Sequence, residues 1–487
     1  MHKELVDLSH LVGGSCFVIK DAFSEEECNT LILEEYYKAG THYPTSYRNN
    51  SRFVEDDTLL ANKLFNSISQ YIPQEICDSY GKWKFVKINE RLRFCRYLEG
   101  QYFNKHLDGV YHISKTIQSK LTFMIYLNGN NNFKGGETLF FPSKQSDDIT
   151  YRFLPDRGDL IIFDHNIWHS GAPLFSGKKY ILRSDLLYEL QTTDEINILN
   201  HNHLGYIWDT IVFDNKYIVS SSRDCTIKLW DLNLNLLESI EASSYSTLTL
   251  LQLSPLTLVS ACRDTSITLW SIIDDKLKII KVVKNCHKGA ILDLEKINES
   301  IFLSSSADGN IKKWNINGEE LGIFNVHSDW IWQIKVLDVS EFIICTVSED
   351  YTIKIWQIID NNFTILSSIN VNEPCTSCIF DISNRMLYVG SNSGSIYYFT
   401  IDNNWKLIKE GSWIAHKGKI TCFLIDYCKN ILYSSSEDMS IGIWNLTDKL
   451  LCNRYYHQNF VTSLSFIDSS RFISGSYDGT LKIWNRV

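Results

Sequence analysis

The first fifth of the chain alternates between short apolar segments and polar turns. Residues 16–19 are apolar and lead to Ser24, which is followed three residues later by Glu27. This spacing is that of a capping box, so the pattern predicts a strand and then a helix. The buried stripe of that helix is expected to comprise Leu31, Ile32, Leu33, Tyr36 and Tyr37.

A second helix is predicted from about Asp57 to Tyr71, ending before Pro73. One face of it carries Leu59, Leu60, Leu64 and Ile68. From residue 89 onward the apolar period shortens to two. Five segments then alternate as strands do, between turns rich in Gly, Pro and Asn: residues 91–97, 120–127, 137–141, 159–163 and 179–188. Short strands after leading helices predict a double-stranded β-helix (jelly roll) with flanking helices.

After Leu190 one phrase recurs, of the form Arg-Asp-x-Thr-Ile-Lys-Leu-Trp. Its copies end at Trp230, Trp270, Trp314, Trp356, Phe399, Trp444 and Trp484, with Phe399 closing a degraded copy. The intervals are 40, 44, 42, 43, 45 and 40 residues, which is the period of a propeller blade. We therefore expect a mainly β protein of two domains, residues 1–190 and a seven-bladed β-propeller over residues 195–487.

The repeats resemble the WD-repeat family. The resemblance implies that a His, a Ser or Thr, an Asp and a Trp form a hydrogen-bonded network in each blade. The histidines at matching places are His201 or His203, His287, His327, His416 and His457. Ser393 replaces the Asp of the fifth copy, so its network should be incomplete. The chain ends three residues after Trp484, so the last blade should lack an outer strand, which residues 195–200 could supply.

Composition narrows the class of protein. Residues 1–190 carry 22 basic against 24 acidic side chains, and the remainder carries 25 against 33. Neither part has the basic surplus of a nucleic-acid-binding protein. No apolar run of about 18 residues or secretory leader is evident, which predicts a cytoplasmic or nuclear protein without a membrane span. The 13 cysteines are scattered, and the lone Cys375-x-x-Cys378 pair is expected to be buried in a strand rather than to bind metal.

Two histidines and a carboxylate form the strongest chemical pattern. His106 and Asp108 read His-x-Asp at the end of a predicted strand, and His169 follows a later apolar strand. Two histidines and one carboxylate are the facial triad of non-haem Fe(II) sites, which leaves open positions for other ligands. Lys179 and Arg183 share a strand face further on, and either cation could bind the distal carboxylate of a dicarboxylic co-substrate.

Residues 1–190 resemble the prolyl 4-hydroxylase-like branch of the Fe(II)/2-oxoglutarate dioxygenases. Four phrases in order carry the resemblance: Tyr97-Leu98-Glu99-Gly100-Gln101-Tyr102-Phe103 through Asp108, residues 121–128, residues 133–138, and His169-Ser170-Gly171 through residues 179–185. The resemblance implies that His106, Asp108 and His169 hold iron. Lys179 would bind 2-oxoglutarate, with Arg183 as its rival, while Tyr126 donates nearby and Tyr97 lines the pocket.

A basic and amide-bearing group precedes the site: Arg48, Asn50, Arg52, Arg91, Arg93 and Arg96. These side chains either line a substrate mouth, for which we single out Asn50 and Arg52, or form ion pairs on strand faces.

The resemblance implies a 2-oxoglutarate-, Fe(II)- and ascorbate-dependent hydroxylase acting on a prolyl or other side chain of a protein or peptide. The propeller would then recruit substrate or partner. The alternative is a WD-repeat scaffold with a vestigial oxygenase domain, which four matched site positions disfavour. Oxidative demethylation of nucleic acid is disfavoured by the acidic charge balance.

Overall fold

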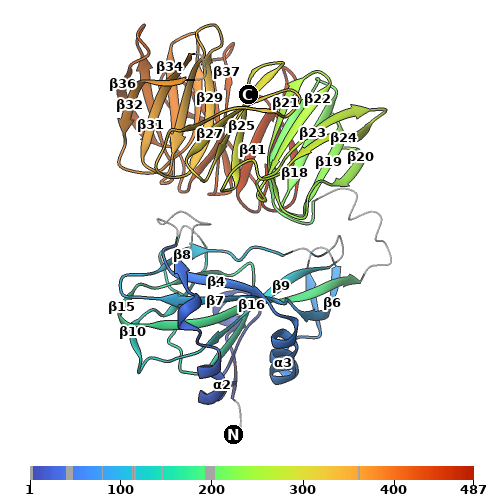
Figure 1. Ribbon diagram of the computed structural model, residues 1–487, viewed down its shortest axis with the longest axis vertical. Helices are drawn as coiled ribbons and strands as arrows, with labels where there is room; N and C mark the ends of the chain where they lie inside the picture. The colour runs from blue at the N-terminus through green and yellow to red at the C-terminus, as the bar shows by residue number, and fades with distance from the viewer. Residues whose placement is uncertain are drawn as a thin grey trace. The chain divides into compact units, whose positions relative to one another are not determined.

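The computed structural model describes residues 4–39, 48–78, 81–111, 113, 117–143, 146–191, 203–359 and 362–487. The chain divides into two compact units, Met1–Glu195 and Ile196–Val487. Both are built mainly from β-strands (Figure 1).

The described part of the first unit contains three α-helices and two short 3-10 helices. They are α1 (Ser9–Val12), α2 (Glu25–Thr30), α3 (Thr58–Ile68), η1 (Glu34–Tyr36) and η2 (Ser69–Tyr71). Its strands are β1 (Leu5–Asp7), β2 (Cys16–Ile19), β3 (Lys38–Ala39), β4 (Ser51–Asp56), β5 (Glu75–Asp78), β6 (Gly81–Ile88), β7 (Arg91–Tyr97), β8 (Phe103–His106), β9 (Ile117–Tyr126), β10 (Phe133–Gly135), β11 (Thr138–Phe141), β12 (Tyr151–Phe153), β13 (Leu160–Asp164), β14 (Trp168–Gly171), β15 (Leu174–Gly177) and β16 (Lys179–Gln191).

These strands form a large sheet and two smaller ones. The large sheet runs β1-β2-β13-β9-β16-β7-β4-β3, with β6 pairing β16 and β5 pairing β6. A four-stranded sheet runs β12-β11-β14-β8, and β10 pairs with β15. The strands predicted near residues 91–97, 120–127, 137–141, 159–163 and 179–188 correspond to β7, β9, β11, β13 and β16.

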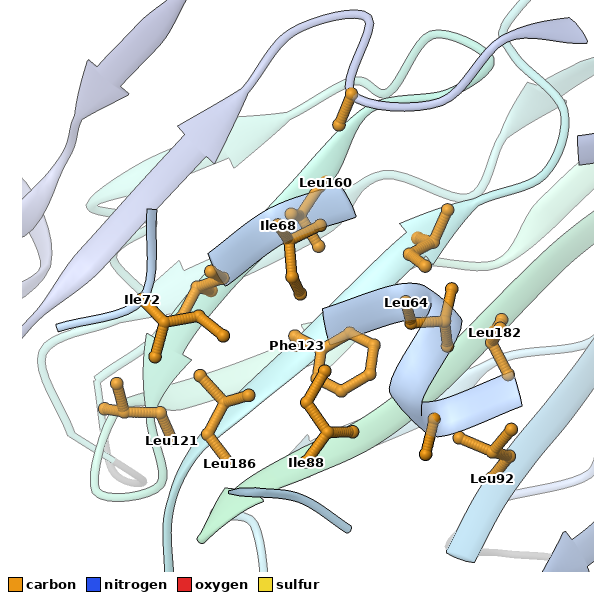
Figure 2. Packing of buried hydrophobic residues seen from close by; sticks show 14 of the residues in the cluster. Leu64, Ile68, Ile72, Ile88, Leu92, Leu121, Phe123, Leu160, Leu182 and Leu186 are labelled. Atoms are coloured by element: carbon orange, nitrogen blue, oxygen red, sulfur yellow. The ribbon is translucent and has the colours of Figure 1, made fainter. Parts of the chain in front are cut away.

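Alternation along β9 assigns its two faces to different cores. Leu121, Phe123 and Ile125 belong to the cluster that also contains Leu64 and Ile68 of α3 (Figure 2). Met124 and Tyr126, on the opposite face, belong to a second cluster with Phe140 of the four-stranded sheet and Ile181 of β16. The large sheet is therefore covered by α3 on one face, and its other face packs against the smaller sheet.

The helix predicted from Asp57 to Tyr71 is confirmed as α3 followed by η2. Asp57 is its N-cap, and the Asp57 carboxylate accepts a hydrogen bond from the Leu60 N–H at 2.9 Å. The predicted face is wrong at one position, because Leu59 is 83% exposed. Ala61, Leu64 and Ile68 form the buried stripe instead, at spacings of three and four residues.

The predicted capping box at Ser24 and Glu27 is confirmed, but the helix that it begins is shorter than expected. α2 ends at Thr30, after Cys28 and Asn29, which all favour helix weakly. The chain then turns, so that the Tyr37 ring lies 5.2 Å from the Phe53 ring, centroid to centroid. Tyr36 is exposed rather than part of a buried helical stripe.

The second unit repeats one antiparallel sheet. Its described residues form six four-stranded sheets and one three-stranded sheet, each in sequential strand order. The strands are β17 (Ile207–Phe213), β18 (Tyr217–Ser222), β19 (Thr226–Asp231), β20 (Leu236–Glu241), β21 (Thr247–Ser254), β22 (Thr257–Cys262), β23 (Ile267–Ile273), β24 (Lys276–Val283), β25 (Ile291–Asn298), β26 (Ile301–Ser306), β27 (Asn310–Asn315), β28 (Glu320–Asn325), β29 (Ile331–Asp338), β30 (Ile343–Ser348), β31 (Thr352–Ile359), β32 (Asn362–Asn370), β33 (Cys375–Asp381), β34 (Met386–Ser391), β35 (Ser395–Ile401), β36 (Leu407–Ile414), β37 (Ile420–Asp426), β38 (Ile431–Ser436), β39 (Ser440–Asn445), β40 (Leu451–Tyr456), β41 (Val461–Phe466), β42 (Arg471–Ser476) and β43 (Leu481–Asn485).

The first strand of each sheet lies beside the first strand of the next, and β41 lies beside β17. The Thr462 hydroxyl donates to the Ile207 carbonyl oxygen at 2.7 Å, and the Val212 N–H donates to the Ser465 hydroxyl oxygen at 3.2 Å. The first and last sheets are therefore in contact, which closes the ring and is consistent with a propeller.

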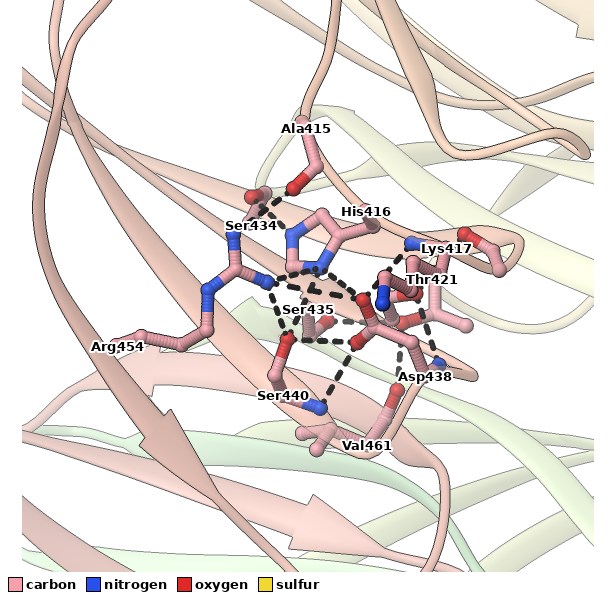
Figure 3. A network of polar contacts seen from close by, with 12 residues as sticks. Ala415, His416, Lys417, Thr421, Ser434, Ser435, Asp438, Ser440, Arg454 and Val461 are labelled. Carbon is pink, nitrogen blue, oxygen red and sulfur yellow. Dashed lines mark hydrogen bonds and ion pairs between the residues drawn. The ribbon is translucent and has the colours of Figure 1, made fainter. Parts of the chain in front are cut away.

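The expected polar network is present in the sixth sheet (Figure 3). His416 Nδ1 lies 3.0 Å from Asp438 Oδ2, and its Nε2 lies 2.7 Å from the Ser434 hydroxyl, which also accepts from the Trp444 indole at 2.8 Å. Arg454 strengthens this copy by donating to the Ser440 hydroxyl at 2.8 Å. His203, His287, His327 and His457 form the same network in their sheets, so these histidines are structural.

The fifth copy departs from the network as predicted. Ser393 stands in place of the aspartate and donates to Glu373 Oε1 at 3.1 Å. Phe399 fills the tryptophan position without a donor group and is fully buried. Cys375 and Cys378 are buried in this sheet.

The last sheet has three strands among the described residues, β41-β42-β43. Residues 195–200, which were predicted to add its outer strand, lie outside the described residues, as does His201.

Candidate metal centre

Strand pairing brings the two predicted histidine ligands together. β8 runs antiparallel to β14 with His106 opposite His169, and their ring centroids are 4.2 Å apart. Asp108 lies two residues beyond the end of β8, and its N–H donates to the His165 carbonyl oxygen at 3.2 Å. One possible ligand atom from each of His106, Asp108 and His169 lies within 4.8 Å of the other two.

Backbone carbonyls fix which imidazole nitrogen faces inward. His106 Nδ1 lies 2.7 Å from the Asn104 carbonyl oxygen, and His169 Nδ1 lies 2.9 Å from the Ile167 carbonyl oxygen. A carbonyl oxygen can only accept, so both Nδ1 atoms carry the hydrogen and each Nε2 keeps its lone pair. The two Nε2 atoms lie 3.6 and 3.7 Å from the same oxygen, Asp108 Oδ1.

The three side chains are held in the ionisation states that bind a metal. All three residues are buried. Burial lowers the pKa of His169 to about 3 and also lowers the pKa of His106, so both imidazoles are neutral near pH 7. Burial alone would raise the pKa of Asp108, but the Arg183 guanidinium holds it well below its usual range.

The donor set fits a non-haem Fe(II) ion. Two neutral imidazoles and one carboxylate on one side of the centre are the facial triad ligands, and the imidazole Nδ1–H groups bonded to carbonyls are the usual outer support of such ligands. The Thr122 hydroxyl adds a further support by donating to Asp108 Oδ2 at 2.5 Å.

A cavity adjoins the triad and is lined by residues of both facing sheets. Its lining residues are Arg48, Cys95, Tyr97, Phe103, His106, Met124, Thr138, His169, Ser170, Gly171, Lys179, Ile181 and Arg183. Lys179 and Arg183 were predicted to share one face of their strand, and both line this cavity, as does Ile181 between them.

Lys179 and Arg183 have different neighbours. The Lys179 ammonium donates to the Gly136 carbonyl oxygen and lies 5.2 Å from the Tyr126 ring centroid and 5.7 Å from that of Tyr97. Burial lowers the pKa of Lys179 to about 7. The Arg183 guanidinium donates instead to Asp108 Oδ1, so it adjoins the triad.

A glycine turn makes room for Lys179. Gly136 has φ +69°, and a Cβ there would lie 2.8 Å from Leu174 Cδ1 and 3.3 Å from Lys179 Cδ. A side chain at this position would therefore displace the Leu174 side chain and crowd Lys179.

The two predicted tyrosines are both buried near Lys179. Tyr97 lines the cavity, and the Tyr126 hydroxyl lies 2.7 Å from the Thr138 hydroxyl, which brings Thr138 into the site. Burial raises the pKa of Tyr97 to about 12 and raises that of Tyr126 further, so both phenols stay protonated.

The predicted substrate residues have a different arrangement from the one expected. Asn50 does not line the cavity; its carboxamide oxygen accepts from Arg48 Nε at 2.9 Å and from Arg48 Nη2 at 2.7 Å. Arg48 itself lines the cavity, with its guanidinium carbon 4.1 Å from the Phe103 ring centroid. Arg52, on β4, also does not line the cavity. Asn50 thus orients the arginine that reaches the site.

The other three arginines of this group form ion pairs on strand faces. Arg91 pairs with Asp56 at 3.5 Å, Arg93 with Asp185 at 2.9 Å and Arg96 with Glu34 at 3.0 Å. For these residues the ion-pair interpretation is correct.

Thr122 and Thr138 were missed by the sequence analysis. Thr122 lies two residues before Met124 and four before Tyr126, so the period of the strand could have indicated its face. No comparable pattern marks Thr138, whose position depends on the packing of two sheets.

Comparison with known proteins agrees with the two-part organisation. Residues 92–184 match the family model of the 2OG-Fe(II) oxygenase superfamily. Residues 196–231, 318–357, 407–445 and 449–485 match that of the WD domain, G-beta repeat. The chain thus carries a 2OG-Fe(II) oxygenase-family domain and WD40 repeats. The oxygenase-family domain implies Fe(II) as cofactor and 2-oxoglutarate as co-substrate.

The curated proteins that are similar to this chain are WD-repeat proteins. The chain is 23% identical over 285 residues to nuclear distribution protein PAC1 of Arthroderma otae, covering 55% of this chain and 56% of that protein. It is 22% identical over 324 residues to the WD repeat domain-containing protein 83 homolog of Dictyostelium discoideum, covering 58% and 96%. It is 25% identical over 338 residues to apoptotic protease-activating factor 1 of Rattus norvegicus, covering 56% and 26%. The chain thus spans about half the length of PAC1.

Among the residues that the structure describes, no helix has the length and apolar character needed to cross a membrane.

Proposed function

We propose that the chain is an Fe(II)- and 2-oxoglutarate-dependent oxygenase that hydroxylates a C–H bond of a protein or peptide. The observation that carries the proposal is the buried group of His106, Asp108 and His169 beside a cavity that also contains a buried lysine. In this proposal residues 1–190 form a double-stranded β-helix of the prolyl 4-hydroxylase-like branch. The two facing sheets that both contribute to the site support that fold.

His106 Nε2, His169 Nε2 and a carboxylate oxygen of Asp108 would hold the iron. Bound there, Fe(II) supplies the chemistry by which oxygen converts 2-oxoglutarate into succinate and carbon dioxide and adds one oxygen atom to a substrate C–H bond. The chain orients the ligands through the Asn104 and Ile167 carbonyls. Burial of all three ligands limits the access of water to the reacting atoms.

Lys179 is our choice for the residue that binds the distal carboxylate of 2-oxoglutarate. Burial disfavours its charge, so a carboxylate beside it would restore the protonated form and gain a charge-assisted hydrogen bond. Arg183 already donates to Asp108, which makes it the weaker candidate. Tyr97 and Tyr126, both protonated, would complete this end of the pocket.

The WD40 repeats are proposed to recruit the substrate or its carrier, as a seven-bladed propeller whose last blade is completed by residues 195–200. WD40 repeats generally mediate protein interactions. Trp208, Trp330 and Trp332, at or beside the starts of β17 and β29, are partly exposed, and tryptophan is enriched in the energetic centres of protein interfaces. A prolyl side chain is the first substrate to test, and the cytoplasm or nucleus is the proposed location.

The test is release of succinate from 2-oxoglutarate by the purified full chain with Fe(II), ascorbate and candidate prolyl peptides. Turnover is expected for the wild type and not for Asp108→Ala. Asp147→Ala removes an exposed carboxylate outside the site and is expected to retain turnover. Equal turnover in the wild type and Asp108→Ala, or none in the wild type, would contradict the proposal and favour a scaffold.

A further inference from the structure

The two oxygens of the Asp108 carboxylate have different neighbours. Oδ2 accepts from the Thr122 hydroxyl at 2.5 Å. Oδ1 accepts from Arg183 Nη2 and is also the oxygen that lies 3.6 and 3.7 Å from the two imidazole Nε2 atoms. The oxygen that faces the two histidines is therefore the one that accepts the hydrogen bond from Arg183.

The Arg183 backbone is fixed within the large sheet. Arg183 lies in β16, opposite Met124 of β9 on one side and Arg93 of β7 on the other. The side chain is 15% exposed and lines the cavity beside the triad. A guanidinium cannot lose its proton near neutral pH, so this positive charge stays beside any metal bound there.

Positive charge exceeds negative charge around the cavity. Arg48 and Arg183 line it, and Lys179 adds a third positive charge when it is protonated, whereas Asp108 is the one carboxylate of the triad. A divalent metal would add two positive charges next to Arg183, and like charges at such distances repel strongly where water is scarce. Arg183 should therefore oppose metal binding at the triad.

We propose that Arg183 weakens metal binding at the triad, because its fixed positive charge is hydrogen-bonded to the Asp108 oxygen that faces both histidines. Arg183 is a positioning residue in this account, because it acts through Asp108. This inference rests on the proposed function, since it takes the triad as the metal site and 2-oxoglutarate as the co-substrate.

Loss of the Arg183 charge should tighten metal binding both with and without 2-oxoglutarate, because a fixed charge repels the metal in either state. The factor by which 2-oxoglutarate tightens metal binding arises from the attraction between those two groups, so it should stay close to its wild-type value.

The experiment is calorimetric titration of the full chain with Mn(II), with and without saturating 2-oxoglutarate, for the wild type, Arg183→Gln, Arg183→Met and Arg183→Lys. Gln and Met are expected to tighten Mn(II) binding about tenfold or more, both with and without 2-oxoglutarate. Lys keeps the charge and should behave like the wild type. Arg96→Gln removes an arginine of the same sheet that pairs with Glu34, and should leave Mn(II) binding unchanged.

Unchanged or weaker Mn(II) binding in whichever neutral variant is folded, as judged by circular dichroism, would overturn this inference while leaving the proposed function intact. Mn(II) binding that fails in the wild type as well would contradict the metal site itself, and the proposed function with it. The two failures are thus distinguishable. Two neutral variants are included so that misfolding of one still leaves the other to decide.

Discussion

His106 and His169 are cross-strand partners whose ring centroids lie 4.2 Å apart, although 63 residues separate them in the chain. The Nδ1 atom of each ring points away from the centre and is hydrogen-bonded to the backbone carbonyl two residues earlier. The same local geometry thus occurs twice, once on β8 and once on β14, and the antiparallel register makes the two copies converge. Asp108 completes the group from the segment that follows β8.

Because the two histidines would bind one ion, their removal should be strongly non-additive. His106→Ala and His169→Ala are each expected to abolish detectable Mn(II) binding, and the double variant should be no worse than either. Calorimetric titration measures this. The matched control is His10→Ala, which removes an exposed histidine from α1 and should retain binding. Independent, additive losses would argue that the histidines do not share a ligand.

Lys179→Met should weaken 2-oxoglutarate binding about tenfold or more while leaving Mn(II) binding unchanged, because a charge-assisted hydrogen bond contributes about 1.5–3 kcal/mol. The neighbouring Lys178 provides the control. It is exposed and pairs with Glu34, so Lys178→Met should bind 2-oxoglutarate as the wild type does. Equal affinity for 2-oxoglutarate in both variants would contradict the assignment of Lys179 as the residue that binds the distal carboxylate. Arg183 would then become the better candidate.

The affinity for 2-oxoglutarate should also fall as the pH rises above 7. Burial lowers the pKa of Lys179 to about 7, so above that pH the free protein holds a neutral amine. Binding of a carboxylate must then take up a proton, which weakens the affinity by up to about tenfold for each pH unit. Titrations between pH 6 and 9 measure the slope. A profile that stays flat in the wild type would show that Lys179 is charged throughout.

The polar network of the sixth repeat predicts a stability difference between equivalent positions. Asp438→Ala should lower the free energy of unfolding by about 2–3 kcal/mol, because the variant leaves buried His416 and Ser440 without their acceptor. Ser393→Ala alters the corresponding position of the fifth repeat and should cost less than about 1 kcal/mol. Denaturant titration compares the two, and a larger loss for Ser393→Ala would contradict the account.

Two aspartates on inner strands should make the WD40 unit less stable as the pH rises. Burial raises the pKa of Asp209 to about 6 and that of Asp293 to about 7. Their protonated forms are favoured in the folded state, so their stabilising effect is complete below about pH 4 and is lost as the pH rises to 7. Lys335 stays charged over this range and does not change the slope.

Asp293→Asn should therefore flatten the pH dependence of unfolding between pH 4 and 8. Each pKa unit corresponds to about 1.4 kcal/mol, and because Asp293 is partly exposed we expect a difference of about 2 kcal/mol across this range. Thermal unfolding of both proteins at several pH values measures it. Parallel curves for the wild type and the variant would contradict this assignment.

Period and repetition predicted the strands and the sevenfold recurrence, because these depend on local alternation and spacing. The His-x-Asp motif and a later histidine indicated the group of His106, Asp108 and His169 that the structure brings together. The alternation also placed Lys179 and Arg183 on one face of β16. It could not separate their roles, since a period of two gives the face of a strand but not the neighbour that each side chain meets across the sheet. That neighbour depends on register, which brings Arg183 opposite Met124 and near Asp108.

Side-chain pairs that depend on tertiary packing also could not be predicted from the sequence. Asn50 was expected at the substrate mouth, but it supports Arg48 by accepting two hydrogen bonds from that guanidinium. Leu59 is apolar and was therefore assigned to the buried face of α3, yet it is exposed. The buried stripe is set by the sheet that α3 covers. In both cases the residue type was compatible with two environments.

The most direct test of the central claim is the stoichiometry of divalent metal bound to the full chain, measured by equilibrium dialysis with Mn(II) in the presence of 2-oxoglutarate. The triad predicts one ion for each chain in the wild type and none in Asp108→Ala. Absence of binding in the wild type, or binding that persists unchanged in Asp108→Ala, would contradict the assignment of His106, Asp108 and His169 as the metal centre.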